Sequence, residues 1–217
     1  MPVRVGLKYI EKWQESMEDQ VLAYEKQPVE KNKIVFYGPS NFTRWSKKWG
    51  MIPLEESLLG KSGNKCAINR GFGSTNAEHQ LYYYPRMIKP LEPKVLVYAP
   101  FGNYTPFGYT VEEVWELAQR VMIYAKTDFP EIRIYICGPK TNKKTTPERL
   151  SEMKEFEKLS KEFVAEHEGF YYIDCIDIPG CNRDDVFVED GVHFNQKGYE
   201  FYTEFFREAL KDELKEF

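Results

Sequence analysis

The sequence predicts a three-layer α/β/α sandwich with a five-stranded parallel sheet, and three observations lead to this fold class. Five short runs of β-branched and aromatic residues are apolar at nearly every position, which is typical of parallel strands covered on both faces. Between these runs, apolar residues recur at the three- and four-residue steps of amphipathic helices. Strands that alternate with helices favour right-handed crossovers, which place helices on both sides of one sheet.

The apolar runs give the strands in chain order. The expected strands are residues 34–38, 66–71, 94–99, 132–138 and 170–175. None of them alternates apolar with polar residues as a half-exposed antiparallel strand would. We therefore expect every strand to be covered by helices on both faces of the sheet.

Helix signals fill the intervals between the strands. An amphipathic helix is predicted for about residues 7–25, packed on a single domain that spans residues 1–217. Thr110 and Glu113 have the spacing of a capping box, which places a helix start there. Further candidate N-caps are Thr146, before a helix that runs to about His167, and Asn195, before the last helix.

Composition and charge exclude several classes of function. The chain has 42% apolar and 29% charged residues, a net charge of −4 and no basic run, so a nucleic-acid partner is not expected. No stretch approaches the roughly 20 apolar residues of a membrane span, and the charged N-terminus lacks the apolar core of a signal peptide. We expect a soluble, cytoplasmic protein. Its four cysteines form no C-x-x-C pair and are expected to be buried free thiols.

The loops that follow the strands carry the candidate chemistry. In open parallel sheets, ligands bind outside the carboxyl ends of the strands. Ser40 follows the first strand, Ser74 the second and Asn103 the third, while Asp190 and His193 lie on a longer loop after the fifth. A serine, glycine-rich backbone, an amide side chain and an Asp–His pair are the parts of an acyl-transfer site.

His193 is the best candidate for a base, because a serine hydroxyl is a weak nucleophile without one. Asp190 lies three residues upstream, close enough on a tight turn to bond one imidazole nitrogen and leave the other for the serine proton. The remaining histidines, His79 and His167, lie in predicted helices. For Ser40 the alternative is an N-cap that satisfies backbone N–H groups and takes no part in chemistry.

Four blocks of the sequence resemble the conserved blocks of the SGNH (GDSL-type) hydrolases, in order and at suitable spacing. These blocks are IVFYGPSNFTRW, NRGFGST, YAPFGNYTPFGYT and FVEDGVHFNQKGY. The second and fourth are the most specific, since the last keeps D-G-x-H-x-N-x-x-G-Y intact. The resemblance covers the whole chain and implies a flavodoxin-like sheet, a serine esterase activity and no metal or organic cofactor.

The resemblance also implies a role for each matched residue. Ser40 would be the nucleophile, His193 its base and Asp190 the carboxylate that orients the base. The oxyanion hole would consist of the backbone N–H groups of Ser40 and Ser74 and the side-chain amide of Asn103.

Three positions depart from the family pattern: Pro39 before the nucleophile, Ser74 in place of glycine, and Tyr104 in place of the acid after the asparagine. A side chain at Ser74 would either narrow the pocket or force a disfavoured φ, so this part of the oxyanion hole is the most altered.

The substrate pocket is expected beside an aromatic loop. Phe101, Tyr104 and Phe107, together with Arg70, are the candidate substrate contacts. The alternatives are that some of these rings fill the core and that Arg70 only makes structural hydrogen bonds. The expected substrate is a small carboxylic ester, an acetylated sugar being the favoured example, and no oligomeric state is indicated.

Two other functions remain as alternatives at this stage. One is a non-catalytic binding protein of the same fold with an altered oxyanion hole. The other is a flavodoxin-like phosphate or nucleotide binder, which the absence of G-x-x-x-x-G-K-[ST] and G-x-G-x-x-G motifs disfavours.

Overall fold

A computed structural model describes residues 10–102 and 108–217, with side chains from Met17 onwards. It confirms the predicted fold class: five parallel strands form one sheet in the order β2-β1-β3-β4-β5. The strands are β1 (Ile34–Gly38), β2 (Ala67–Gly71), β3 (Val95–Tyr98), β4 (Arg133–Cys137) and β5 (Phe170–Ile173). Each lies within, or coincides with, the corresponding predicted run.

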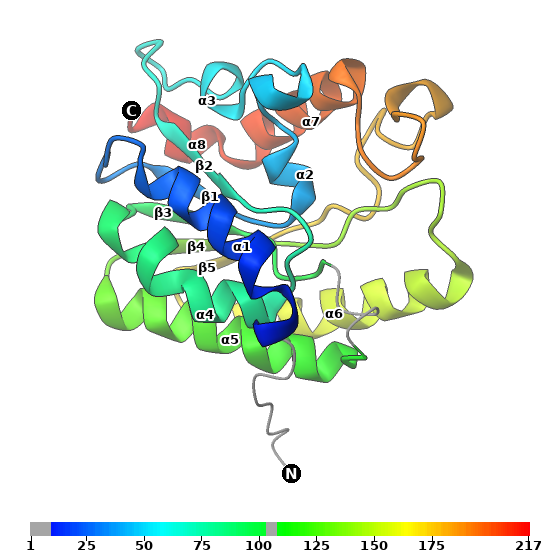
Figure 1. Ribbon diagram of the computed structural model, residues 1–217, viewed down its shortest axis with the longest axis horizontal. Coiled ribbons are helices and arrows are strands. Elements are labelled where there is room, and N and C mark those ends of the chain that lie inside the picture. The colour runs from blue at the N-terminus through cyan, green and yellow to red at the C-terminus, as the bar shows by residue number, and fades with distance from the viewer. Residues whose placement is uncertain (1–9, 103–107) are drawn as a thin grey trace.

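Helices cover both faces of the sheet (Figure 1). One face is covered by α1 (Ile10–Glu25), α4 (Ala77–Met87), α5 (Val111–Asp128) and α6 (Pro147–Glu166). The other is covered by α2 (Ser40–Thr43), α3 (Leu54–Ser57), α7 (Gln196–Ala209) and α8 (Lys211–Lys215). Short 3-10 turns occur at Lys47–Trp49, Lys89–Leu91 and Asp184–Val186. Each face has its own buried apolar cluster, which is the packing expected of a three-layer sandwich.

The predicted helix caps are present. The Thr110 side chain accepts a hydrogen bond from the Glu113 N–H, and the Glu113 side chain accepts one from the Thr110 N–H. Thr146 accepts from the Arg149 N–H, and Asn195 accepts from the Gly198 N–H. These caps fix where α5, α6 and α7 begin, and the last of them places α7 directly after the His193 loop.

Two glycines allow the first loop to approach the sheet closely. A Cβ at Gly38 would lie 2.8 Å from the Ala99 Cβ, and one at Gly71 would lie 2.4 Å from the Thr43 backbone nitrogen. Only glycine fits such contacts, so β1 and β2 end where α2 can sit against them. This packing fixes α2, and with it Ser40, at the carboxyl edge of the sheet.

All four cysteines are buried and unpaired, as predicted. The Cys137 and Cys175 sulfurs lie 3.3 Å apart beneath β4 and β5. Among residues 10–102 and 108–217, no helix has both the length and the apolar composition needed to cross a membrane.

Candidate active site

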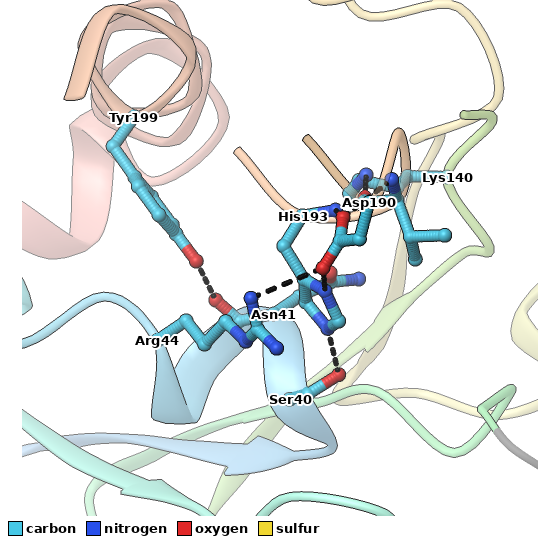
Figure 2. A network of polar contacts seen from close by, with 8 residues as sticks. Ser40, Asn41, Arg44, Lys140, Asp190, His193 and Tyr199 are labelled. Carbon is cyan, nitrogen blue, oxygen red and sulfur yellow. Dashed lines mark hydrogen bonds and ion pairs between the residues drawn. The ribbon is translucent and has the colours of Figure 1, made fainter. Parts of the chain in front are cut away.

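Ser40 is the first residue of α2, directly after β1. The N-cap of this helix is Pro39, whose side chain makes no capping bond, so the N-cap alternative for Ser40 is wrong. The Ser40 hydroxyl instead bonds His193: Oγ lies 2.8 Å from the His193 Nε2 atom (Figure 2). A strand that ends in a short helix thus presents the hydroxyl to a base 153 residues away.

Within its own turn, Asp190 accepts three hydrogen bonds, two from His193 and one from its neighbour Val192. Its Oδ2 lies 2.7 Å from the His193 Nδ1 atom. Its Oδ1 accepts from the backbone N–H groups of Val192 at 2.8 Å and His193 at 2.9 Å. Gly191 in this turn has a φ of 66°, which glycine adopts at little cost. The turn therefore fixes the imidazole so that Nε2 faces Ser40.

The electrostatics of this group keep the imidazole available as a proton acceptor. Burial lowers the pKa of His193, the Asp190 carboxylate opposes this, and the positive charges of Arg44 and Lys140 add to the lowering. Burial tends to raise the pKa of Asp190, but the two backbone donors and His193 together bring it well below its usual range. Near neutral pH, Asp190 is therefore an anion that accepts the Nδ1–H of a neutral His193, and Nε2 accepts the Ser40 proton.

Two further side chains, Arg44 and Tyr199, brace this arrangement. Arg44 Nη1 lies 3.2 Å from Asp190 Oδ2, and its guanidinium lies over the Trp49 ring at 4.3 Å. The Tyr199 hydroxyl donates to the Asn41 carbonyl at 2.8 Å, tying α7 to α2 (Figure 2). Arg44 carried a usable signal, because it lies one helical turn after Ser40.

Ser74 occupies a left-handed backbone conformation, with φ of 63°. Serine seldom adopts this region, which glycine enters freely. The preceding Gly73 N–H donates to Gln20 Oε1 at 2.7 Å, so it is already used. Within the described residues, neither the Ser40 nor the Ser74 N–H has a hydrogen-bond acceptor. The turn thus keeps at Ser74 the left-handed conformation that a glycine would adopt freely, despite the side chain.

A cavity of about 230 Å³ opens beside Ser40, between the loops that follow β3 and β4. Phe101, one of the predicted substrate contacts, lines it and packs against Phe156 with ring centroids 4.9 Å apart. The predicted contacts Tyr104 and Phe107, and the predicted oxyanion donor Asn103, lie outside the described residues.

Arg70 is not at this cavity. Its side chain is buried under α1, where Nη1 donates to Gln27 Oε1 at 2.9 Å and the guanidinium lies 4.9 Å from the Tyr24 ring centroid. Alternation along β2 explains the difference. Asn69 faces α2, where its side chain donates to the Phe42 carbonyl, and Arg70 consequently faces the opposite layer. We withdraw Arg70 from the substrate contacts.

Lys140, after β4, is a cavity residue that the sequence reasoning missed. Its ammonium donates to the Val192 carbonyl at 3.0 Å and lies 4.0 Å from the Phe194 ring centroid. Burial lowers its pKa to about 8. The neighbouring Lys143 N–H donates to the Gly191 carbonyl at 3.0 Å, so this loop supports the His193 turn at two points. The signal was the GPKTNKK segment, which follows a strand at the same edge of the sheet.

The other two histidines lie apart from this centre, as expected. His79 belongs to the capping box of α4 with Asn76, and His167 follows α6, where Nδ1 bonds the Phe163 carbonyl oxygen at 2.8 Å. In the part of the chain that the structure covers, no three His, Cys, Asp or Glu side chains are grouped as metal ligands would be.

Comparison with known proteins reveals similarity in structure only. No protein-family model matches the sequence, and no curated protein matches it either. A lipase/acylhydrolase from Enterococcus faecalis is 22% identical, with a TM-score of 0.67 over 85% of this chain and 97% of that one. A GDSL-like lipase from Bacteroides thetaiotaomicron is 15% identical, with a TM-score of 0.61 over 93% and 97%.

A third solved structure is a variant of an acetyl-xylooligosaccharide esterase from Geobacillus stearmophilus. It is 12% identical, with a TM-score of 0.64 over 85% of this chain and 96% of that one. The matches cover nearly the full length of the known structures, and they show that the chain has the fold of the GDSL-like lipases and acylhydrolases.

Proposed function

We propose that the protein is a carboxylic ester hydrolase that works through an acyl-enzyme on Ser40. The observation that carries this proposal is the unbroken chain of hydrogen bonds from Asp190 through His193 to Ser40, at the mouth of a cavity. A serine becomes a nucleophile when a fixed, neutral base can take its proton, and both conditions hold here.

The reaction follows from the bonds already present. As Ser40 Oγ attacks the ester carbonyl, its proton passes to His193 Nε2, and the imidazolium that forms is stabilised by the Asp190 carboxylate. His193 then protonates the leaving alcohol, which departs and leaves an acyl-Ser40 ester. Water next occupies the position of the alcohol, loses a proton to Nε2, and attacks the acyl group to release the acid and restore Ser40.

The negative charge that develops on the carbonyl oxygen needs donors placed in advance. We assign this task to the backbone N–H groups of Ser40 and Ser74, which have no acceptor among the described residues, and to the Asn103 amide on the sequence resemblance. Such donors act mainly on the transition state, because the oxyanion exists only there and in the tetrahedral intermediate.

Small acyl groups, acetate in particular, suit the site best. The cavity of about 230 Å³ is lined partly by the bulky Phe101 and Met153 side chains, which favours a short acyl group over a long one. The structural similarity to an acetyl-xylooligosaccharide esterase supports acetylated carbohydrates as the alcohol component. Each methylene that a pocket accommodates adds roughly 0.8 kcal/mol of burial, so a blocked pocket should show no gain from acetate to octanoate.

The test combines labelling with turnover. An alkyl fluorophosphonate should add one adduct, mapped by mass spectrometry to Ser40, and Ser40→Ala should abolish both labelling and hydrolysis of 4-nitrophenyl acetate. Ser46→Ala is the matched control, because Ser46 is on the same loop but its hydroxyl bonds the Thr43 carbonyl. An adduct on Ser46, Ser62 or Ser74 would overturn the assignment, and octanoate esters outpacing acetate in kcat/KM would remove the acetyl preference.

A further inference from the structure

We propose that the cavity beside Ser40 is a binding site for an anionic group carried by the substrate, so that the preferred esters bear a carboxylate or phosphate. This inference rests on the proposed esterase function and adds a substrate class to it. It is carried by the charge of the residues that line the cavity.

Three of the lining side chains are cations: Lys140, Lys144 and Arg149. None of the described residues that line the cavity is acidic, although the whole chain has 34 acidic and 30 basic residues. Acidic residues outnumber basic ones over the whole chain. A cavity whose described lining has three cations and no carboxylate therefore differs in charge from the chain as a whole. A concave, partly apolar site concentrates such a field and attracts a ligand of opposite charge.

Lys140 provides the innermost charge. Its ammonium is held against the Phe194 ring and donates to the Val192 carbonyl, but none of the described carboxylates lies within ion-pairing distance of it. Burial of a cation without an ion-pair partner costs free energy, which is why its pKa is lowered to about 8. A bound anion would supply the missing partner and recover part of this cost.

Lys144 and Arg149 add two further positive charges to the lining of the cavity. Lys144 is exposed and forms no ion pair with any described carboxylate. Arg149 is paired with Glu152 at 3.1 Å, and it donates to the Gly102 carbonyl at 3.2 Å with its guanidinium 4.4 Å from the Phe101 ring centroid. Its charge is thus partly offset but fixed in place, so the two lysines supply most of the attraction.

Oxyanion stabilisation is the main competing role for these cations. A cation that acted on the oxyanion would speed neutral and anionic esters alike, because both form the same tetrahedral intermediate. A cation that binds a substrate anion changes the ratio between them. The ratio of kcat/KM for charged and neutral esters of one shape therefore separates the two roles.

The experiment uses three acetate esters: 4-acetoxybenzoate, 4-acetoxyphenyl phosphate and the neutral 4-acetoxybenzamide. Each kcat/KM is divided by the rate of alkaline hydrolysis of the same ester, which corrects for the leaving group. At low ionic strength at least one charged ester should exceed the amide by about tenfold, the gain from a charge-assisted hydrogen bond. The excess should fall in 0.5 M NaCl. The two charged esters distinguish a carboxylate site from a phosphate site.

Variants locate the effect in the cavity. Lys144→Gln should lower the charged-to-neutral ratio about threefold or more, mainly through KM. Lys154→Gln, which removes an exposed lysine of α6 outside the cavity, should leave the ratio unchanged. Lys140→Gln should lower the ratio further. If Lys140→Gln also disturbs the His193 turn, Lys144→Gln still tests the proposal.

The outcomes separate the two proposals. Equal corrected rates for all three esters, with turnover that depends on Ser40, would overturn the anion site and leave the esterase intact. The anion site would also be overturned if Lys140→Gln and Lys144→Gln each lowered kcat/KM by the same factor for all three esters. If none of the esters is hydrolysed, the esterase proposal fails, and calorimetry with Ser40→Ala decides the site. Tighter binding of 4-hydroxybenzoate than of 4-hydroxybenzamide would then support it, and equal affinity would overturn it.

Discussion

The two sides of Ser40 differ in how completely their polar groups are satisfied. On the base side, both oxygens of Asp190 are bonded, His193 is bonded at both ring nitrogens, and Arg44 closes the set. We group the predicted oxyanion donors with the cavity residues as the cavity side: there the Ser74 N–H lacks an acceptor within the described residues, and the partly buried Lys140 has no carboxylate partner among them. The base side is thus fully hydrogen-bonded without substrate, whereas under the proposed mechanism a bound substrate would supply the missing partners on the cavity side.

The largest expected effect comes from the base side. His193→Ala should lower kcat by about 10³-fold or more, because it removes the only base that contacts Ser40 among the described residues. Steady-state hydrolysis of 4-nitrophenyl acetate measures it. His167→Ala is the control, since that ring is exposed and bonds the Phe163 carbonyl. Near-normal activity in the His193 variant would mean that the hydrogen bonds among Asp190, His193 and Ser40 are structural. The difference between the two sides would then have no role in catalysis.

The next effect tests the predicted oxyanion hole. Asn103→Ala should lower kcat by roughly 10²–10³-fold with KM little changed, because losing one oxyanion donor weakens the transition state rather than the bound ester. This prediction comes from the sequence resemblance. The control is Asn64→Ala, at an exposed position far along the chain, where the amide bonds Ser62. A rise in KM at constant kcat would assign Asn103 to substrate binding instead.

Backbone strain at Ser74 should appear as a change in stability. Ser74→Gly should raise the free energy of unfolding by about 1 kcal/mol, since glycine adopts a φ near 63° without the steric penalty of a Cβ. Urea denaturation measures the change.

The matched control for Ser74 is Asn32→Gly, where φ is 60°. Asparagine tolerates this region better than serine, so the gain should be smaller. A lower stability of the Ser74→Gly variant would show that the serine side chain makes a favourable contact that outweighs the backbone strain at this position.

The smallest effect sharpens the description of the base side. Because the pKa of His193 is lowered and the base must be neutral, kcat/KM should rise with pH through a midpoint below 6.5. Arg44→Gln removes a positive charge that opposes protonation of His193, so the midpoint should move to higher pH. Lys48→Gln, an exposed change on the same loop, is the control. A shift to lower pH would contradict the assigned role of Arg44.

The sequence was sufficient for the sheet and for the base side because both depend on local patterns. Continuous apolar runs identified all five strands. Asp190 and His193 are three residues apart, and a single turn of the chain is enough to bring the carboxylate to the imidazole ring. Ser40 could be joined to them only through the rule that parallel strands end at one edge of the sheet.

The cavity side was less predictable because it depends on which layer a side chain faces. Arg70 looked like a rim residue, but the alternation set by Asn69 turns it under α1. Lys140 looked like one of several loop lysines, and only the distance to Val192 on the His193 turn shows its position. Neither fact can be read from spacing along the chain.

The loop after β4 connects substrate preference to the geometry of the base. Lys143 holds the Gly191 carbonyl through its backbone N–H, which any residue except proline can supply, whereas Lys140 holds the Val192 carbonyl through its side chain. If this loop were exchanged for that of a protein with the same fold, the backbone bond to the Gly191 carbonyl would survive. The bond to the Val192 carbonyl would depend on which residue replaced Lys140. A change of charge at Lys140 therefore also changes the support of His193, so specificity altered at this position should require a second, compensating substitution in the His193 turn.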